Sequence, residues 1–510
     1  MHPAVKPALR VALEVLVLAL AAWQVYAVGL AMAHRLGANF DLEWMEGATL
    51  ISGLRASQGL PFYTAPGPDY IPFIYPPLYA WTLGVLAQVF PIGYTLGRGV
   101  SIACTAVAMA LLAVGARREG ARWPVAVGVA ALFLGCYEEG GTFYDLVRID
   151  SMALMFTGAA LVCGRGETRA AAITSGLLLA VAFTAKHNMA MLGLPIALWR
   201  WRTLGLRDAL VFVAASAGPA LAFTVAMQVY TGGLFLTYLL GVPGSHGIVF
   251  DRALPTLGAN GKITGAQAEV WRALPWVITV GVATIGAWAR TRGGGYWAGV
   301  IGVTLVMVSL MRGHVGGFLN VLIPLLWLAP LVAVLAERAL SRDTGWRAWL
   351  PHVFTALVAV QLWRGHGDLK KYVPTDRDAD NAQALVDELR ALPGPMLMPH
   401  GPWYPVLAGK EPSLALITLW DIAKERGVLK RESRVVERAM AQGRWATVII
   451  PDKPALGYGM EENYRKAGSL KARPFNTRTG WPVRFGKIWH PKREAAGTSA
   501  DSALDETALP

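Results

Sequence analysis

Asp41–Tyr79 reads DLEWMEGATLISGLRASQGLPFYTAPGPDYIPFIYPPLY and lies between two strongly apolar segments. It places three carboxylates, Asp41, Glu43 and Glu46, within six positions, and it then becomes rich in proline and aromatic residues. A loop that only joins two membrane helices needs neither feature. The stretch therefore predicts a structured loop that contributes to a site.

The first half of this stretch predicts a helix over residues 41–57, because no proline interrupts it and a Gly-Leu-Pro sequence follows it. Asp41 would lie near the N-cap, where a carboxylate accepts free backbone N–H groups. Glu43 and Glu46 would share a face with Leu50. This pattern is typical of an amphipathic helix lying on a membrane surface. A solvated acidic turn followed by an interfacial anchor is the alternative interpretation.

The composition of the whole chain indicates a polytopic membrane protein. Of its 510 residues, 54% are hydrophobic and only 16% are charged. Apolar runs recur as far as Trp363 and predict a mainly α fold, with about eleven transmembrane helices in residues 1–363 and an outer loop at 34–79. The net charge of +13 comes from basic residues clustered in short loops between these runs. That clustering follows the positive-inside pattern, so nucleic acid is not an expected partner.

The topology follows from the same pattern. The first apolar run, Val11–Ala33, is long enough to span a bilayer. It predicts an uncleaved signal anchor in the cell (inner) membrane, with the N-terminus in the cytoplasm. Arg117, Arg165, Arg202 and Arg290 would then all lie on the cytoplasmic side, and the 34–79 loop would face outward.

The last part of the chain changes character. Residues 364–491 have a soluble composition that predicts a small α/β domain, extracytoplasmic by the parity of the spans. Helices are expected over Asp378–Leu392 and Glu432–Gln442, and strands over Met396–Met398 and Ala446–Ile450. Residues 492–510 are small, polar and acidic and predict a disordered tail.

Polar side chains gather on the predicted outer face. Ionisable residues at a membrane boundary are costly, so each one calls for an explanation. Taken singly, each can be explained by snorkelling, helix capping or ion pairing. Their convergence at the outer ends of several segments instead indicates one functional site. The set comprises Asp41, Glu43, Glu46, Asp145, Arg148, Asp150, Lys186, His187, His246, Asp251, Arg312, His314 and Asn320.

The order of these motifs resembles that of the GT-C membrane glycosyltransferases, which include protein mannosyltransferases and the aminoarabinose transferases that modify lipid A. The acidic first loop ends in Tyr-Pro-Pro-Leu, and the second outer loop carries two aspartates in YDLVRIDSMAL. A lysine follows in AFTAKHN, and a late GGFLN leads into a span that contains proline. The resemblance covers most of residues 10–340. Where the family usually has adjacent Asp-Glu, this chain has Trp-Met-Glu-Gly at 44–47.

The resemblance implies transfer of a sugar from a polyprenyl-phosphate donor to a glycan, lipid or protein acceptor of the cell envelope. Transfer would occur on the outer face with inversion of the anomeric centre. A carboxylate would take the proton of the attacking acceptor group. Asp41, Glu43 and Glu46 are the candidates for this base. Family position favours Glu46, the short side chain at a helix start favours Asp41, and Glu43 is expected to matter less.

The remaining residues of the polar set receive roles from the same resemblance. A polyprenyl-phosphate leaving group needs cations, for which the candidates are Arg148, Lys186, His187, Arg312 and His314. The substrate cavity, which would also contact membrane lipids, is expected to include Tyr75, Pro76, Tyr79, Asp145, Asp150 and Asn320. No cofactor is required, although oxygen ligands from Asp41, Glu46 and Asp150 could hold a divalent metal ion.

Two functions of other classes fit the membrane composition. A transporter or flippase of envelope lipids would show internal repeats with broken helices at corresponding positions. The later half contains no second copy of the 41–79 pattern, which counts against this alternative. The other alternative is an inactive scaffold that holds an envelope enzyme through its C-terminal domain.

Overall fold

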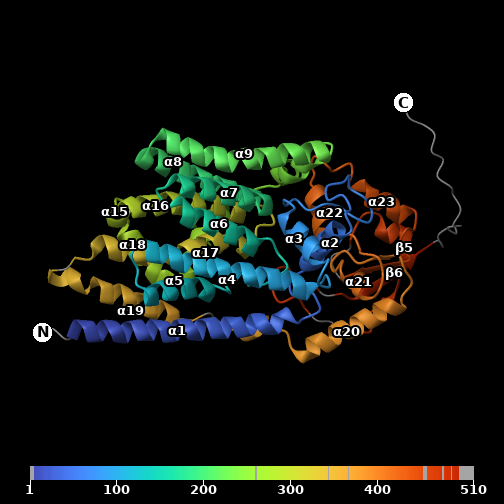
Figure 1. Cartoon of the computed structure of the whole chain (residues 1–510). Coiled ribbons are helices and arrows are strands. Elements are labelled where there is room, and N and C mark those ends of the chain that lie inside the picture. The colour runs from blue at the N-terminus through green and yellow to red at the C-terminus, as the bar shows by residue number, and fades with distance from the viewer. Residues whose placement is uncertain are drawn as a thin grey trace.

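The computed structural model describes residues 5–258, 261–342, 344–365, 367–451, 456–473, 476–483 and 485–492. It is mainly helical up to residue 363 and mixed α/β beyond, with the two parts at opposite ends of the view in Figure 1. Apart from Lys492, the predicted disordered tail lies outside the described residues.

The first part of the chain forms a helix bundle with two long irregular connections, at residues 58–77 and 136–149. Its elements are α1 (Val5–Leu36), α2 (Glu46–Ser57), α3 (Leu78–Leu86), α4 (Tyr94–Arg118), α5 (Trp123–Gly135), α6 (Asp150–Gly164), α7 (Arg169–Ala185), η1 (His187–Leu192), α8 (Gly193–Leu204), α9 (Leu206–Tyr230), α10 (Leu234–Leu236), η2 (Thr237–Gly241), α11 (Val242–Gly244), α12 (Phe250–Ala253), β1 (Thr256–Leu257), β2 (Ile263–Thr264), α13 (Ala266–Ala273), α14 (Pro275–Ala283), α15 (Ile285–Trp288), α16 (Arg292–Gly313), η3 (Leu319–Leu322), α17 (Ile323–Leu328), α18 (Leu331–Leu340), η4 (Gly345–Trp349) and α19 (Leu350–Trp363).

Five helical segments among the described residues are long and apolar enough to cross a membrane, judged by length and composition. They are Lys6–Leu36, Tyr94–Arg118, Leu206–Tyr230, Arg292–Gly313 and Leu319–Leu340. Shorter apolar helices accompany them, at Trp123–Gly135, Asp150–Gly164, Arg169–Ala185 and Leu234–Gly244. The predicted polytopic character is therefore confirmed, while the count of eleven spans stays a prediction.

Burial separates central helices from peripheral ones. The apolar window of Leu319–Leu340 is 89% buried, whereas that of Leu206–Tyr230 is only 11% buried. Leu319–Leu340 therefore lies at the centre of the bundle, and α9 presents apolar side chains outward, as a helix facing lipid does. Figure 1 shows α9 along one edge of the bundle and α1 along the opposite edge.

The C-terminal part folds around a four-stranded sheet of order β3-β4-β6-β5. β3 and β4 pair in parallel and the other pairs are antiparallel, with an irregularity in β5 between Lys466 and Gly468. The two predicted helices and the two predicted strands coincide with α20, α23, β3 and β4. The elements are η5 (Leu369–Tyr372), α20 (Asp376–Ala391), β3 (Met396–Leu397), α21 (Tyr404–Leu407), α22 (Leu416–Ile422), α23 (Arg434–Ala441), β4 (Thr447–Ile450), α24 (Met460–Asn463), β5 (Tyr464–Ser469) and β6 (Lys487–Pro491).

The helix predicted over residues 41–57 begins later than expected, because α2 starts at Glu46 and residues 41–45 form an irregular turn. Residues 46–53 are all buried, so the prediction of a helix lying on the membrane surface is wrong. α3 covers α2 from one side, and the C-terminal part approaches from another. A side chain at Gly47 would place its Cβ 2.8 Å from the Cβ of Trp403, so this approach requires glycine.

Candidate functional site

A cavity of about 570 Å³ lies where the helix bundle meets the C-terminal part. Eight of the predicted site residues line it, namely Glu43, Tyr75, Arg148, Lys186, His187, His246, His314 and Asn320. Residues of the C-terminal part complete the wall, namely Ile417, Trp420, Asp421, Gly480 and Trp481. Segments from both parts of the chain therefore build one cavity.

Glu43 is the member of the acidic trio that lines this cavity. It lies in the turn before α2, and its Oε2 accepts a hydrogen bond from the backbone N–H of Met45 at 3.2 Å. Gly480, at φ +73°, packs against it so closely that a Cβ there would lie 3.0 Å from the Cγ of Glu43. Burial raises the pKa of Glu43 to about 7, against the lowering effect of Arg148. The carboxyl group therefore titrates near neutral pH.

Arg148 lies beside Glu43, with its Nη1 3.6 Å from Glu43 Oε2. Its Nε is 3.9 Å from Asp150 Oδ2, and its guanidinium packs against the rings of Tyr75 and Phe143. Nη1 also contacts Met45 Sδ at 2.9 Å, but Nε has no hydrogen-bond partner among the described residues. A buried guanidinium with an unused donor is suited to binding an anion.

Lys186 follows α7 and reaches Asp150, the first residue of α6. Its Nζ donates a hydrogen bond to Asp150 Oδ1 at 2.8 Å, and Asn320 Nδ2 donates to the same oxygen at 3.0 Å. An ammonium group has three donors, so Lys186 retains donors for a ligand in the cavity. Asp150 does not itself line the cavity, and its role here is to hold Lys186 and Asn320 in place.

The opposite wall contains two histidines and residues of α22. The rings of His246 and His314 lie 4.8 Å apart between centroids, and Trp420 lies 5.4 Å from His246. His246 Nε2 is 3.1 Å from the backbone oxygen of Asp421, and His314 Nε2 is 3.2 Å from that of Pro243. Burial raises the pKa of Asp421 to about 8, against the lowering effect of nearby cations.

Glu46 lies away from the cavity, in a closed network. Arg98 donates to both of its carboxylate oxygens, from Nε to Oε1 at 2.9 Å and from Nη2 to Oε2 at 2.7 Å. The backbone N–H groups of Leu42, Glu43 and Val147 donate to the same two oxygens. Burial opposes ionisation, but Arg98 outweighs it and lowers the pKa of Glu46. With its oxygens already occupied, Glu46 fixes the turn rather than accepting a proton.

Asp41 also faces inward rather than into the cavity. Its Oδ1 accepts hydrogen bonds from Gly47 N–H and Tyr94 OH, both at 2.9 Å. It therefore satisfies a free N–H at the start of α2, as the sequence predicts, although from outside the helix. Burial and the charge of Glu46 raise the pKa of Asp41 well above its usual value. The ionised form that a general base requires is therefore disfavoured at Asp41.

Several other predicted site residues, one of them a predicted phosphate ligand, lie outside the cavity lining and most bind other protein groups. Asp145 pairs with Arg35 at 2.7 Å and accepts from Tyr137 OH at 2.8 Å. Arg312 forms a two-point ion pair with Glu269. Tyr79 and Pro76 are buried outside the cavity lining, and Tyr79 OH donates to Gly97 O at 2.8 Å.

The predicted metal ligands do not form a metal site. Among the described residues, no group of three or more His, Cys, Asp or Glu side chains could hold a metal ion. Asp41 and Glu46 direct their oxygens to protein donors, and Asp150 binds Lys186. These residues do not fit a divalent ion.

Sequence reasoning missed the buried arginines and the contribution of the C-terminal part. Arg98 is a charge inside an otherwise apolar span, and that signal could have identified it as the partner of an acid. Arg35, in the last turn of α1, carries the same signal. Asp421 and Trp481 carry no comparable signal in the sequence, because an acid or a tryptophan in a soluble segment is ordinary.

Two solved structures resemble this chain over nearly its whole length. Apo ArnT from Cupriavidus metallidurans matches with a TM-score of 0.59 and 14% identity, covering 92% of this chain and 97% of ArnT. ArnT from the same organism bound to undecaprenyl phosphate matches with a TM-score of 0.57 and 12% identity, over the same shares of each chain. No protein-family model and no curated protein matches the sequence. The chain thus has the fold of ArnT, a lipid A aminoarabinose transferase of the GT-C class.

Proposed function

We propose that this chain is a membrane glycosyltransferase that moves a sugar from a polyprenyl-phosphate donor to an acceptor of the cell envelope. The observation that carries the proposal is the buried cavity in which Glu43, Arg148 and Lys186 meet. One carboxyl group that titrates near neutral pH lies beside Arg148, with Lys186 in the same cavity lining, within a fold shared with an enzyme solved bound to undecaprenyl phosphate.

Glu43 is the proposed general base, in place of the Glu46 or Asp41 that the sequence favoured. A base must reach the acceptor and have a free oxygen to take its proton. Glu43 lines the cavity, and its Oε2 has one backbone donor at 3.2 Å. Glu46 has its oxygens filled by Arg98 and the backbone, and Asp41 is turned away. Of the three acids, Glu43 therefore meets both requirements.

Arg148 and Lys186 are proposed to hold the donor phosphate. As the bond between the anomeric carbon and the phosphate oxygen breaks, both electrons go to that oxygen, and its negative charge needs fixed donors. Arg148 Nε and the remaining Lys186 donors are available in the cavity. Cations held by Asp150 and Glu43 are already oriented, so little reorganisation is needed when charge develops.

A single displacement is the expected reaction course. The acceptor oxygen or nitrogen forms a bond to the anomeric carbon, its proton passes to Glu43, and the polyprenyl phosphate departs from the opposite side. The configuration at the anomeric carbon is thereby inverted. Trp44 and Trp481, whose rings meet edge to face at 5.3 Å, and Tyr75 supply apolar faces on which sugar rings pack.

The experiment is transfer of radiolabel from polyprenyl-phosphate sugars to membrane extract by the purified full-length protein. The wild type should label an acceptor, and Glu43→Gln should not. Glu461→Gln, which removes an exposed carboxylate in the C-terminal part, is the matched control and should transfer normally. Absence of transfer with every donor sugar, or full transfer by Glu43→Gln, would contradict the proposal.

The orientation of the site forms part of the proposal. The basic loops around Arg117, Arg165, Arg202 and Arg290 support a cytoplasmic N-terminus and an extracytoplasmic domain over residues 364–491. A phosphatase fused after Lys370 should be active, and one fused after Arg118 inactive. The reverse result would place the cavity on the cytoplasmic face.

A further inference from the structure

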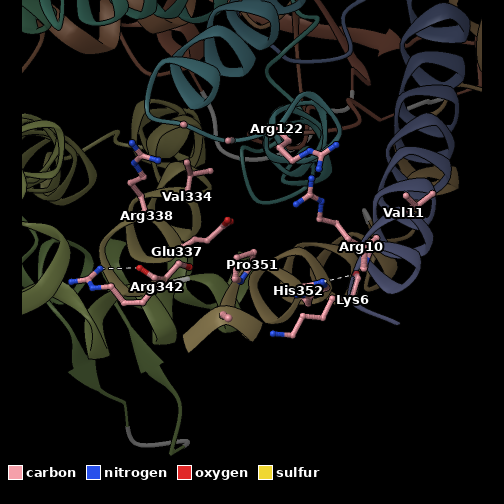
Figure 2. Close-up of a pocket in the computed structure, with 15 residues that line it drawn as sticks. Lys6, Arg10, Val11, Arg122, Val334, Glu337, Arg338, Arg342, Pro351 and His352 are labelled. Atoms are coloured by element: carbon pink, nitrogen blue, oxygen red, sulfur yellow. Dashed lines mark hydrogen bonds between the residues drawn. The ribbon is translucent and has the colours of Figure 1, made fainter. Parts of the chain in front are cut away.

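A second cavity, of about 720 Å³, lies at the end of the bundle away from the C-terminal part. It is formed where the start of α1, the residues before α5, the end of α18 and the start of α19 come together. Figure 2 shows their side chains arranged around an open centre. The site proposed above contributes no residue to this cavity.

Basic side chains dominate the lining of this second cavity. They are contributed by segments far apart in the sequence, namely Lys6, Arg10, Arg122, Arg338 and Arg342. Glu337 is the carboxylate in the lining, and Glu14 lies next to the lining, where it pairs with Arg10 and Arg122. Cations outnumber acids even when Glu14 is included, so the cavity favours an anion.

The ion pairs around the cavity leave some of its basic side chains without an acidic partner. Arg10 and Arg122 share Glu14, at 3.7 Å and 3.0 Å. Arg338, by contrast, makes no hydrogen bond or ion pair within the described part of the chain, and Arg342 donates only to backbone oxygens of Ala339 and Ser341. Two exposed guanidinium groups are therefore free to bind an anion bidentately.

The surface beside the cavity is of the kind that faces lipid. Val11 lines the cavity and is 59% exposed, as is Val15 one turn further along α1. On the other side Trp346 is 70% exposed, and Lys6 Nζ lies 4.9 Å from the ring of Trp349. Tryptophans beside basic residues mark the headgroup level of a bilayer, and exposed valines below them contact acyl chains.

We infer that this cavity binds the phosphate headgroup of an anionic membrane phospholipid, with Arg338 and Arg342 as its principal ligands. A basic pocket between membrane helices at headgroup depth suits such a lipid. The adjoining apolar face of α1 favours a lipid over a free phosphate, since a soluble anion would make no use of it. The inference is independent of the transfer reaction.

The test is native mass spectrometry of the detergent-purified full-length protein, titrated with phosphatidylglycerol or with phosphatidylcholine of the same acyl chains. The wild type should retain phosphatidylglycerol selectively. The double variant Arg338→Gln/Arg342→Gln should bind it ~10-fold or more weakly, because each cation near a membrane surface contributes to anionic-lipid binding. Inorganic phosphate at millimolar concentration should not displace the lipid.

Two control variants separate local binding from general charge and from folding. Arg202→Gln/Arg207→Gln removes two exposed cations at the α8–α9 junction, at the same end of the bundle, and should leave binding unchanged. Arg338→Lys/Arg342→Lys keeps the charge and should retain the lipid. Equal retention of both lipids, or equal weakening by both glutamine pairs, would overturn the inference. Displacement by inorganic phosphate would overturn the assignment to a lipid.

Discussion

Glu43 and Glu46 lie three residues apart in one acidic turn, yet the fold gives them opposite environments. Glu46 is enclosed by Arg98 and three backbone N–H groups, which satisfy both of its oxygens. Glu43 has one backbone donor and an arginine 3.6 Å away, and it faces a cavity. The pKa of Glu46 is lowered and that of Glu43 is raised to about 7.

The same contrast separates two layers of the molecule. Below the cavity, the pairs Glu46–Arg98 and Asp145–Arg35 are closed on all sides and fix the loops that follow α1 and α5. At the cavity, Arg148 Nε lacks a hydrogen-bond partner in the described chain, and so does Oδ2 of Asp150, which binds the lining residue Lys186. A buried polar group that is fully satisfied stabilises one conformation, whereas one that is only partly satisfied is available to a ligand. The closed pairs thus differ from the side chains at the cavity in how many of their hydrogen-bonding atoms are occupied, more than in residue type.

The strongest test of the difference between Glu43 and Glu46 is to remove the charge of Glu43 alone. Glu43→Gln should lower the transfer rate by ~10²–10⁴-fold, the usual contribution of a general base. Its melting temperature should fall less than when the Glu46–Arg98 pair is broken, because Glu43 accepts one backbone hydrogen bond and Arg148 lies 3.6 Å away, beyond hydrogen-bond distance. Transfer assays and thermal unfolding of the same preparation check both parts. A transfer rate within tenfold of the wild type would remove Glu43 from the reaction.

The complementary test changes the Glu46–Arg98 pair, which lies outside the cavity lining. Arg98→Met leaves the Glu46 carboxylate buried without its ionic partner and should destabilise the fold by ~3–5 kcal/mol, as breaking a buried ion pair does. The loss should appear as a lower melting temperature and lower yield from the membrane. Any protein that remains folded should bind donor with ordinary affinity. A normal melting temperature combined with lost transfer would instead place Glu46 and Arg98 in the catalytic machinery.

The cations of the cavity should show an intermediate effect. Arg148→Met and Lys186→Met should each cost ~2–4 kcal/mol of transition-state stabilisation, seen as lower kcat/KM with the polyprenyl-phosphate donor. Lys186→Met also removes the closer of the two cations that pair with Asp150, so thermal unfolding must accompany the kinetics. Arg312→Met is the matched control, because Arg312 pairs with Glu269 outside the cavity lining. Normal donor kinetics in both cavity variants would mean that the phosphate binds elsewhere.

The smallest expected effect is a shift of the pH profile. The base must be ionised, so kcat/KM should rise with pH, with a midpoint near the Glu43 pKa of about 7. Arg148 lowers that pKa, so Arg148→Met should move the midpoint to higher pH. Lys186→Met should leave it in place, because Lys186 pairs with Asp150 rather than Glu43. Identical midpoints in all three proteins would mean that another group controls the rate.

The membrane class, the basic loops and the elements α20, β3, α23 and β4 follow from the amino-acid sequence alone. These depend on composition and on periodicity within short windows, which the chain carries locally. The sequence also placed Arg148 and Lys186, which line the cavity, among the candidate site residues, because a charge beside an apolar span is costly.

Which acid of the first loop faces the cavity depends instead on contacts between segments that are distant in the sequence. Glu46 and Arg98 are 52 residues apart in the sequence, and Glu43 is enclosed by Gly480 from the far end of the chain. Local propensity instead extended α2 back to Asp41 and placed Glu43 and Glu46 on one face. The reason is that the hydrogen bonds a carboxylate accepts come from donors in distant segments of the chain. The spacing of residues within the loop does not predict which donors will reach it.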